Sequence, residues 1–195
     1  AKIVGDMAQS HGKKAVCLGG ANNHLLLLPD ADMDLATQDV VASFCGCSGQ
    51  RCMAASVLRV VGNQPGSVER IVEIASDTTT PPLIDMAATD HVNALVDRAR
   101  NDPDCEFLLD GGVGTAEAFH PSIIRLKRSM VDGATRHWLM TTEIFAPVLV
   151  VVECDTIDDA IQHENESEFG NGASVYTQSG ANAEYATSRF NAGMI

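Results

Sequence analysis

The sequence predicts an α/β fold of three layers, in which helices cover both faces of a mainly parallel sheet. The first observation is that short apolar runs alternate along the 195 residues with longer segments of helical period. The second is that glycine and proline punctuate the chain without clustering, so no linker divides it. Strands separated by helices of this length pair in parallel and pack both faces of their sheet against helices. We therefore expect one continuous domain.

The clearest expected helix follows the second apolar run. Asp30 or Asp32 is a suitable N-terminal cap, apolar residues then recur at roughly helical spacing, and Gly49 ends the pattern. These apolar positions are Leu35, Val40, Val41 and Phe44. Thr156 and Asp159 resemble a capping box, which predicts another helix that ends near residue 163. The remaining expected helices span residues 67–75, 86–100 and 183–190.

Short apolar runs bounded by turn residues or by helical segments are expected to be strands. They span residues 14–18, 25–28, 56–61, 106–109, 122–126, 148–153 and 173–176. Met194 and Ile195 are expected to begin one more strand. The alternation of these runs with the helices is what favours parallel pairing, because a crossover helix joins two parallel strands.

The chain is strongly acidic, with 13 basic and 26 acidic residues and a formal net charge of −13. Such a chain repels nucleic-acid phosphates and anionic membrane surfaces, so neither is expected as a partner. The longest apolar stretches fall far short of the roughly 20 residues that cross a bilayer, and the chain opens on no signal-peptide pattern. Six scattered cysteines do not make a disulfide framework, which favours a reducing, intracellular setting.

Residues 48–53 contain the candidate nucleophile, Cys52. They lie between an expected helix and an expected strand, where a loop lets a side chain point out of a rigid layer. Arg51 and the backbone N–H groups of the loop suit a thiolate and a nearby oxyanion. From the residues alone, the alternative is that Cys52 is a small core residue. A zinc site with Cys45 and Cys47 is disfavoured by the spacing of the thiols, so no metal is expected.

A second candidate segment is residues 143–147. Glu143 and Phe145 are two positions apart, so on an extended chain they point to the same side. A carboxylate there suits a ribose diol and an aromatic side chain suits a flat ring. The alternative is a plain lead-in to a strand, with its entry set by Pro147. His24 follows two asparagines at a turn, and it either positions a site or is a satisfied core histidine.

Four blocks of sequence resemble the NAD-dependent aldehyde dehydrogenase superfamily, most closely its methylmalonate-semialdehyde branch. In chain order the blocks are residues 18–24 with 29–32, residues 49–54, residues 142–150 and residues 169–173. The second block reads GQRCMA, which is specific to the semialdehyde branch. Together the blocks span almost the whole chain. The resemblance therefore implies that residues 1–195 have the fold of the aldehyde dehydrogenase catalytic domain.

The resemblance also implies a role for each candidate residue. Cys52 matches the thiolate that attacks the aldehyde, passes a hydride from the thiohemiacetal to NAD and keeps the thioester, while its backbone N–H forms part of the oxyanion hole. Glu143 matches the residue that binds the nicotinamide-ribose hydroxyls, and Phe145 matches the aromatic residue beside it. Arg51 matches the arginine that recognises the substrate carboxylate or helps acyl transfer to coenzyme A.

One mismatch bears on the fate of the thioester. Hydrolytic members carry a glutamate in a Leu-Glu-Leu-Gly-Gly motif that activates water, but Cys17 and Leu18 stand at the candidate positions here. The resemblance therefore implies acyl transfer from methylmalonate or malonate semialdehyde to coenzyme A. A hydrolytic semialdehyde dehydrogenase is the alternative. Asn22 and Ala146 also depart from the family pattern, which has Lys and Gly there.

The resemblance further implies that the chain is one part of a larger enzyme. No GxGxxG lies between a strand and a helix of this chain. By the resemblance, the nucleotide-binding domain of the superfamily is expected before residue 1 and its C-terminal arm after residue 195. The isolated chain is then expected to be inactive. The full-length enzyme is expected to be a homo-oligomer, in the bacterial cytoplasm or in the mitochondrial matrix of a eukaryote. A truncated domain that folds without catalysing is the alternative.

Overall fold

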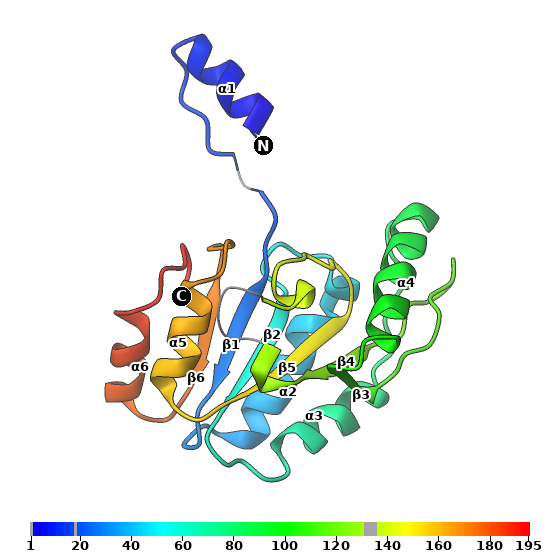
Figure 1. The fold of residues 1–195 in the computed structure, drawn as a ribbon, viewed down its shortest axis with the longest axis vertical. Coiled ribbons are helices and arrows are strands. Elements are labelled where there is room, and N and C mark those ends of the chain that lie inside the picture. The colour runs from blue at the N-terminus through cyan, green and yellow to red at the C-terminus, as the bar shows by residue number, and fades with distance from the viewer. Residues whose placement is uncertain (1, 18, 131–135) are drawn as a thin grey trace.

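The fold is built on a six-stranded sheet in the order β3-β4-β5-β2-β1-β6, seen in a computed structural model that describes residues 2–17, 19–130 and 136–195 (Figure 1). Strand β3 is antiparallel to β4, and the other neighbouring pairs are parallel. The strands are β1 (Asn23–Leu27), β2 (Ala55–Val61), β3 (Cys105–Leu109), β4 (Ser122–Leu126), β5 (Val148–Cys154) and β6 (Ala173–Tyr176). The predicted α/β class with a mainly parallel sheet is confirmed.

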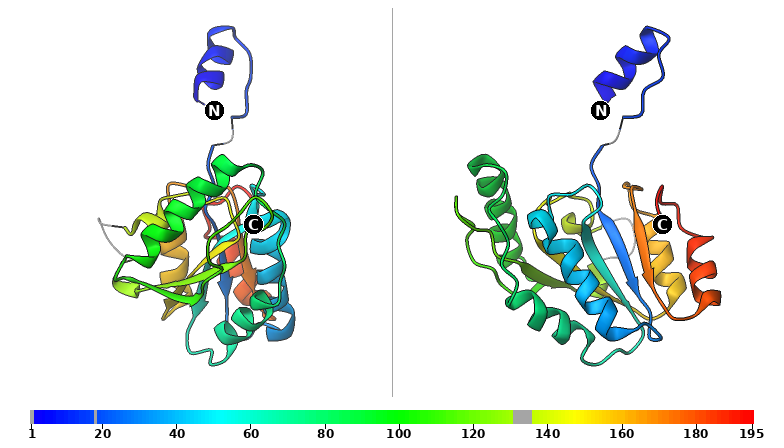
Figure 2. Two further views of the ribbon diagram at one scale, coloured as in Figure 1. Left: turned by 90° about the vertical axis from the view of Figure 1, so that its right-hand side faces the viewer. Right: turned by 180° about the vertical axis from the view of Figure 1, so that it is seen from behind.

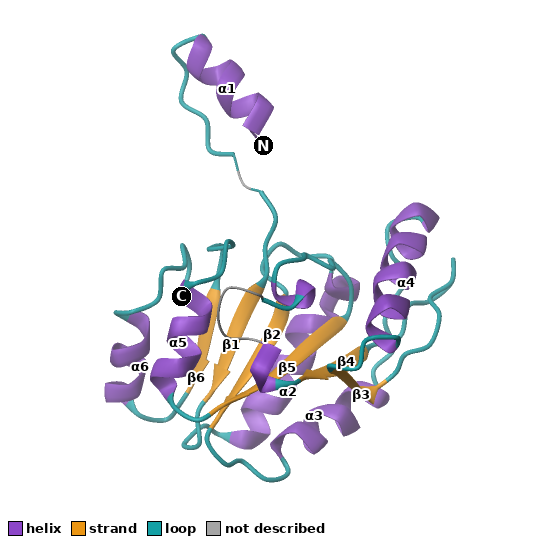
Figure 3. Ribbon diagram, viewed as in Figure 1, coloured by secondary structure: helices purple, strands orange, loops and turns teal. Residues whose placement is uncertain are grey.

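Helices cover both faces of this sheet (Figures 2 and 3). Helices α2 and α3 pack on one face, against Leu27 and Leu58, whereas α4, α5 and α6 pack on the other, against Leu26 and Val57. Neighbouring strand residues point to opposite faces, so strands covered on both sides are apolar at nearly every position. The helices of these layers are α2 (Met33–Cys45), α3 (Ser67–Ser76), α4 (Met86–Arg100), α5 (Ile157–Asn165) and α6 (Gly180–Thr187).

Local sequence patterns predict the starts of α2 and α5 correctly, but not the end of α2. Asp32 caps α2, and Thr156 begins α5 with the predicted capping box. Helix α2 ends at Cys45 instead of continuing to Gly49, because residues 47–48 have a left-handed backbone that a right-handed helix cannot contain. The early end of α2 is followed by a short 3-10 helix, η1 (Gly46–Gly49), and by a loop of residues 50–54 in front of β2.

Two smaller expectations are wrong. Leu35 does not face the core: its side chain is 58% exposed on the solvent side of α2. Helix α6 begins at Gly180, earlier than predicted, because Ser179 caps it with its hydroxyl. Met194, which is expected to begin a strand, makes an isolated parallel bridge with Gly172.

The N-terminal segment also differs from the prediction. Residues 14–17 are a loop outside the sheet, and Val16 is 89% exposed because no described strand pairs with it. Leu18, the last residue of that predicted strand, lies outside the described residues. An unpredicted helix, α1 (Lys2–Ser10), has no buried residue and stands away from the sheet (Figures 1 and 2). Within the described ranges, no helix is both long and apolar enough to span a membrane.

Candidate active site

All four predicted site residues line one pocket. It lies at the amino-terminal ends of β1, β2 and β5 and measures about 400 Å³ with its open mouth included. Arg51 and Cys52 enter it from the loop before β2, whereas Glu143 and Phe145 enter it from the segment before β5. Parallel strands begin at the same edge of a sheet, and this brings together segments that are far apart in the sequence.

The loop before β2 has an unusual backbone. Cys47, Ser48 and Gly49 have φ angles of 52°, 54° and 67°, in the left-handed region that residues with a Cβ atom avoid. The Ser48 hydroxyl donates a hydrogen bond to the carbonyl of Pro81 at 2.6 Å. A Cβ atom on Gly49 would overlap the carbonyl of Ala146. The surrounding segments therefore hold this turn in a costly conformation beside the candidate nucleophile.

Cys52 differs from the buried cysteines. Its side chain is exposed at the pocket, whereas burial raises the pKa of the Cys45 thiol to about 12 and that of Cys105 to about 11. The side-chain amides of Asn23 and Asn171 donate hydrogen bonds to the backbone carbonyl of Cys52, at 2.8 and 2.7 Å. The sequence pattern predicts no role in this site for either asparagine, although both lie in blocks that resemble the family.

Two side chains of opposite charge, each without a partner among the described residues, enter the pocket. Among the described residues, no ion pair or side-chain hydrogen bond engages the Arg51 guanidinium or the Glu143 carboxylate. Arg51 lies over Gly46, where a Cβ atom would overlap the guanidinium. A Cβ atom on Gly20 would lie 3.0 Å from Oε2 of Glu143 and 3.1 Å from the ring of Phe169. Both charges are thus available to a ligand, and Gly20 leaves space beside the carboxylate.

Phe145 reaches the pocket by a different backbone path from the predicted one. Its φ angle is 56°, so the segment is not extended there, and the expectation that Glu143 and Phe145 project from the same side of an extended chain is wrong. The Phe145 ring is 42% exposed. A left-handed backbone at a bulky aromatic residue is strained, and such strain is commonly stored where a ligand binds.

The two departures from the family pattern are accommodated by the fold. Ala146 is buried, and it is not among the residues with positive φ, so its methyl group adds no left-handed strain. The amide of Asn22 donates to the carbonyl of Leu139 at 3.2 Å. Asn22 thereby ties the start of β1 to a short 3-10 helix, η3 (Trp138–Met140), at the edge of the pocket.

His24 lies in the core instead of in the pocket. Its side chain is 1% exposed, and its Nδ1 lies against the carboxylate of Glu164 on α5. Arg59 on β2 is fully buried nearby and donates a hydrogen bond to Nδ1 of His163 at 3.1 Å. Burial and the charge of Arg59 lower the pKa of His24. Of the two interpretations of His24, the structure supports the core residue.

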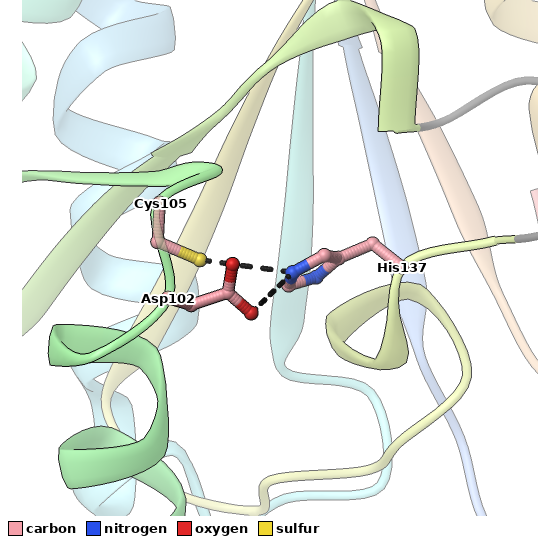
Figure 4. A group of neighbouring side chains, drawn as sticks. All are labelled: Asp102, Cys105 and His137. Atoms are coloured by element: carbon pink, nitrogen blue, oxygen red, sulfur yellow. Dashed lines mark hydrogen bonds and ion pairs between the residues drawn. The ribbon is translucent and has the colours of Figure 1, made fainter.

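A separate polar group joins the start of β3 to the segment before η3 (Figure 4). His137 Nε2 lies 2.9 Å from the carboxylate of Asp102 and 3.9 Å from the sulfur of Cys105. The indole N–H of Trp138 donates to the same carboxylate at 3.2 Å. Sulfur, imidazole and carboxylate are also the donor types of zinc sites. Here the imidazole of His137 and the carboxylate of Asp102 are already hydrogen-bonded within the protein, and these bonds join two loops outside the pocket.

The whole chain, residues 1–195, matches the model of the aldehyde dehydrogenase family. The chain belongs to the aldehyde dehydrogenase family. Malonate-semialdehyde dehydrogenase 1 of Oceanobacillus iheyensis is 32% identical over 100% of this aldehyde dehydrogenase chain and 42% of its own length. Methylmalonate-semialdehyde dehydrogenase of Oceanimonas doudoroffii superposes with a TM-score of 0.84 at 29% identity, over 97% of this chain and 41% of that one.

A third relative was solved with a cofactor. It is a Sinorhizobium meliloti protein, assigned as a methylmalonate-semialdehyde dehydrogenase and complexed with NAD. Its TM-score to this aldehyde dehydrogenase chain is 0.86 at 27% identity, over 97% of this chain and 41% of that one. The chain therefore spans about two fifths of the length of each of these relatives.

Proposed function

We propose that the chain is the catalytic domain of an NAD-dependent semialdehyde dehydrogenase that transfers the acyl group of methylmalonate or malonate semialdehyde to coenzyme A. The observation that carries the proposal is the convergence of Cys52, Arg51 and Glu143 on one pocket. The names of the relatives support the substrate class. The proposal includes the nucleotide-binding domain and the homo-oligomer that the family resemblance implies for the full-length enzyme.

Cys52 supplies the nucleophile in this proposal. Its thiolate adds to the aldehyde carbon, and the carbonyl oxygen takes up the negative charge as the C–S bond forms. The backbone N–H of Cys52 is one donor for that oxyanion. When NAD is bound, it accepts the hydride that leaves the same carbon. The carbon then becomes the carbonyl of a thioester on the sulfur of Cys52.

Arg51 is the proposed recognition group for the carboxylate of the semialdehyde. A guanidinium binds a carboxylate through two parallel, charge-assisted hydrogen bonds, and Arg51 has no competing ion pair among the described residues. The net charge of −13 repels an anionic substrate at long range. A positively charged side chain in the pocket, such as Arg51, is therefore required to bind an anionic substrate.

The residues beside Cys52 fit the nicotinamide ribose of NAD. The Glu143 carboxylate accepts hydrogen bonds from a diol, and it has no partner among the described residues. Beside it, Gly20 leaves room that a Cβ atom would fill. The exposed ring of Phe145 offers an apolar surface to a flat ring, and Ala146 beside it is buried. These side chains hold the ribose and the ring, and Cys52 remains free to react.

Coenzyme A is the proposed acyl acceptor. Cys17 and Leu18 stand where hydrolytic relatives carry the glutamate that activates water, and Glu143 is the one carboxylate among the described residues that line the pocket. A thiolate attacks a thioester readily without such a base. The coenzyme A sulfur bonds to the acyl carbon, the C–S bond to Cys52 breaks, and Cys52 leaves as a thiolate.

The decisive experiment is Cys52→Ser in the full-length enzyme that contains this chain. We expect turnover to fall at least about a thousandfold, because an alcohol replaces the thiol nucleophile. Cys47→Ser is the matched control: it removes another exposed thiol of the same loop and is expected to retain turnover. Wild-type turnover by Cys52→Ser would contradict the assignment. Free acid formed at the same rate without coenzyme A would overturn acyl transfer in favour of hydrolysis.

A further inference from the structure

We propose that Asn23 and Asn171 are positioning residues for Cys52, which they orient by holding its backbone carbonyl oxygen from two sides. We call this pair the amide clamp. The inference rests on the proposed function, because it concerns the orientation of the proposed nucleophile. It adds to the site two uncharged residues that act through the backbone of Cys52.

The two side-chain amides occupy both acceptor positions of one carbonyl oxygen. Nδ2 of Asn23 donates to the Cys52 oxygen at 2.8 Å and also to the Ala54 oxygen at 2.8 Å. Nδ2 of Asn171 donates to the Cys52 oxygen at 2.7 Å. A carbonyl oxygen has two lone pairs, so its hydrogen bonding is complete. The peptide plane after Cys52 is thereby fixed, and with it the direction in which the side chain of Cys52 leaves the backbone.

The two halves of the amide clamp have different supports. Asn23 is 5% exposed and opens β1, inside the sheet. Asn171 is half-buried in the turn before β6, where its carbonyl accepts a hydrogen bond from the backbone N–H of Met194 at 3.2 Å. The N–H of Ala173 donates to the carbonyl of Met194 at 2.9 Å. One half is therefore fixed by the sheet, and the other depends on the last residues of the chain.

Met53, the residue after Cys52, also contacts the turn before β6. Nδ2 of Asn171 lies 3.1 Å from the sulfur of Met53. A Cβ atom on Gly172 would overlap the terminal methyl of Met53. The turn before β6 thus fits residues 52 and 53 in two ways. The amide of Asn171 donates to the Cys52 carbonyl, and the missing side chain at Gly172 leaves room for Met53.

Stability alone does not require the Asn171 bond. Cys52 is at the surface, where water satisfies a carbonyl oxygen with little change in stability. The loop is also closed by its own backbone, since the N–H of Ala54 donates to the Arg51 carbonyl at 3.0 Å. Water does not hold a carbonyl in one orientation, and reaction rates fall steeply when a nucleophile is misplaced. The effect of Asn171 is therefore expected in the rate at Cys52.

The test is acylation of Cys52 by p-nitrophenyl acetate in the chain of residues 1–195. The thiolate bonds to the ester carbonyl carbon, nitrophenolate leaves, and an acetyl thioester remains on the sulfur, so no cofactor is needed. Peptide mass spectrometry follows acetylation of Cys52 and of Cys47, an exposed thiol in the same loop that serves as internal reference. We expect Asn171→Ala to lower the Cys52 rate at least threefold relative to Cys47.

Two further variants separate orientation from general loosening of the fold. Asn101→Ala removes an exposed amide that also donates to one backbone carbonyl, at 2.8 Å, and is expected to leave the ratio of the two rates unchanged. Asn23→Ala is made alone and with Asn171→Ala, and each variant is first checked for folding by circular dichroism. Because both amides act on one oxygen, the effect of the double variant is expected to differ from the product of the single effects.

An unchanged ratio in Asn171→Ala, or effects that simply multiply, would overturn the amide clamp. That failure is distinguishable from failure of the proposed function. Turnover of Cys52→Ser reports whether Cys52 is the nucleophile of the enzyme, whereas the acylation ratio reports whether the two amides orient its thiol. Either result stands without the other.

Discussion

His24 on β1 and Glu164 on α5 are in direct contact between the sheet and the helix, with 1% and 3% of the two side chains exposed. Arg59 on β2 belongs to the same buried group, and its Nε has no hydrogen-bond partner among the described residues. Burial lowers the pKa of Arg59, and the Glu164 carboxylate opposes this shift electrostatically. It is therefore the negative charge that balances a guanidinium in the core.

We expect Glu164→Gln to lower the free energy of unfolding by about 3 kcal/mol, because it leaves a buried cation without its counter-charge. Urea denaturation measures the loss. Glu106→Gln is the matched control, since Glu106 pairs with Arg125 at 3.1 Å but is 63% exposed. That change is expected to stay within about 1 kcal/mol. Equal losses in the two variants would contradict the assignment of a balancing charge to Glu164.

The stability of the chain is expected to fall in mild acid because of His24. Burial and the charge of Arg59 lower the pKa of His24 from its ordinary value of 6.5, so the unfolded chain takes up this proton at higher pH than the folded chain does. The contribution of the neutral imidazole is complete above about pH 6.5 and is lost as the pH falls toward the lower folded-state pKa. Urea midpoints between about pH 7 and pH 5 measure this slope.

His24→Gln removes the titrating group and is expected to flatten that slope, even if it also lowers stability at every pH. His91→Gln is the control, because it removes an exposed imidazole from the surface of α4. A slope that disappears in His91→Gln, or persists unchanged in His24→Gln, would assign the pH dependence to another group.

Cys47→Gly is expected to raise the free energy of unfolding by about 1 kcal/mol. Cys47 has a φ angle of 52° and an exposed side chain, and glycine adopts this left-handed backbone without a Cβ penalty. Ser48→Gly relieves similar strain at 54° but loses the hydrogen bond to Pro81, so it is expected to gain less. Urea denaturation compares the two. A larger gain for Ser48→Gly would show that its hydroxyl is not what holds the turn.

Gly49→Ala is expected to be far more destabilising than its backbone strain alone explains. The added Cβ atom would overlap the Ala146 carbonyl and push the Phe145 segment away from the Cys52 loop. Gly66→Ala is the matched control, because Gly66 also has positive φ, at 87°, with no atom near the added carbon. We expect about 1 kcal/mol for the control and at least about 2 kcal/mol more for Gly49→Ala. Similar values would mean that the two segments move apart freely.

Most of the fold was predictable because its determinants are local. The Asp32 and Thr156 caps and the spacing of apolar residues identify helix starts, and those features do not depend on what packs against them. Residues 14–17 show the limit of this reasoning. Their apolar pattern resembles a strand, but a strand also needs a neighbour, and the described chain provides none. A short apolar run in the sequence does not show whether another strand will pair with it.

The site was predictable to the extent that its residues stand in family-like motifs. Cys52 and Glu143 were placed by those motifs, and the structure brings them to one pocket. The left-handed turn at Phe145 was not predictable, because the usual marker of such a turn is glycine. Asn171 was missed for another reason: its contact with Cys52 joins residues 119 positions apart. Only the folded chain shows such a pair.

The end of α2 has a consequence for how anions bind. Helix α2 stops at Cys45, so the carbonyl end of its dipole, which carries partial negative charge, lies at the loop that leads to the pocket. The guanidinium of Arg51 rests over Gly46, the residue just after that end. Under the proposed function, a substrate carboxylate binds a guanidinium that already lies near this partial negative charge. The charge acts only near the last turn of α2, so it offsets part of the attraction between Arg51 and the carboxylate whatever the length of the helix.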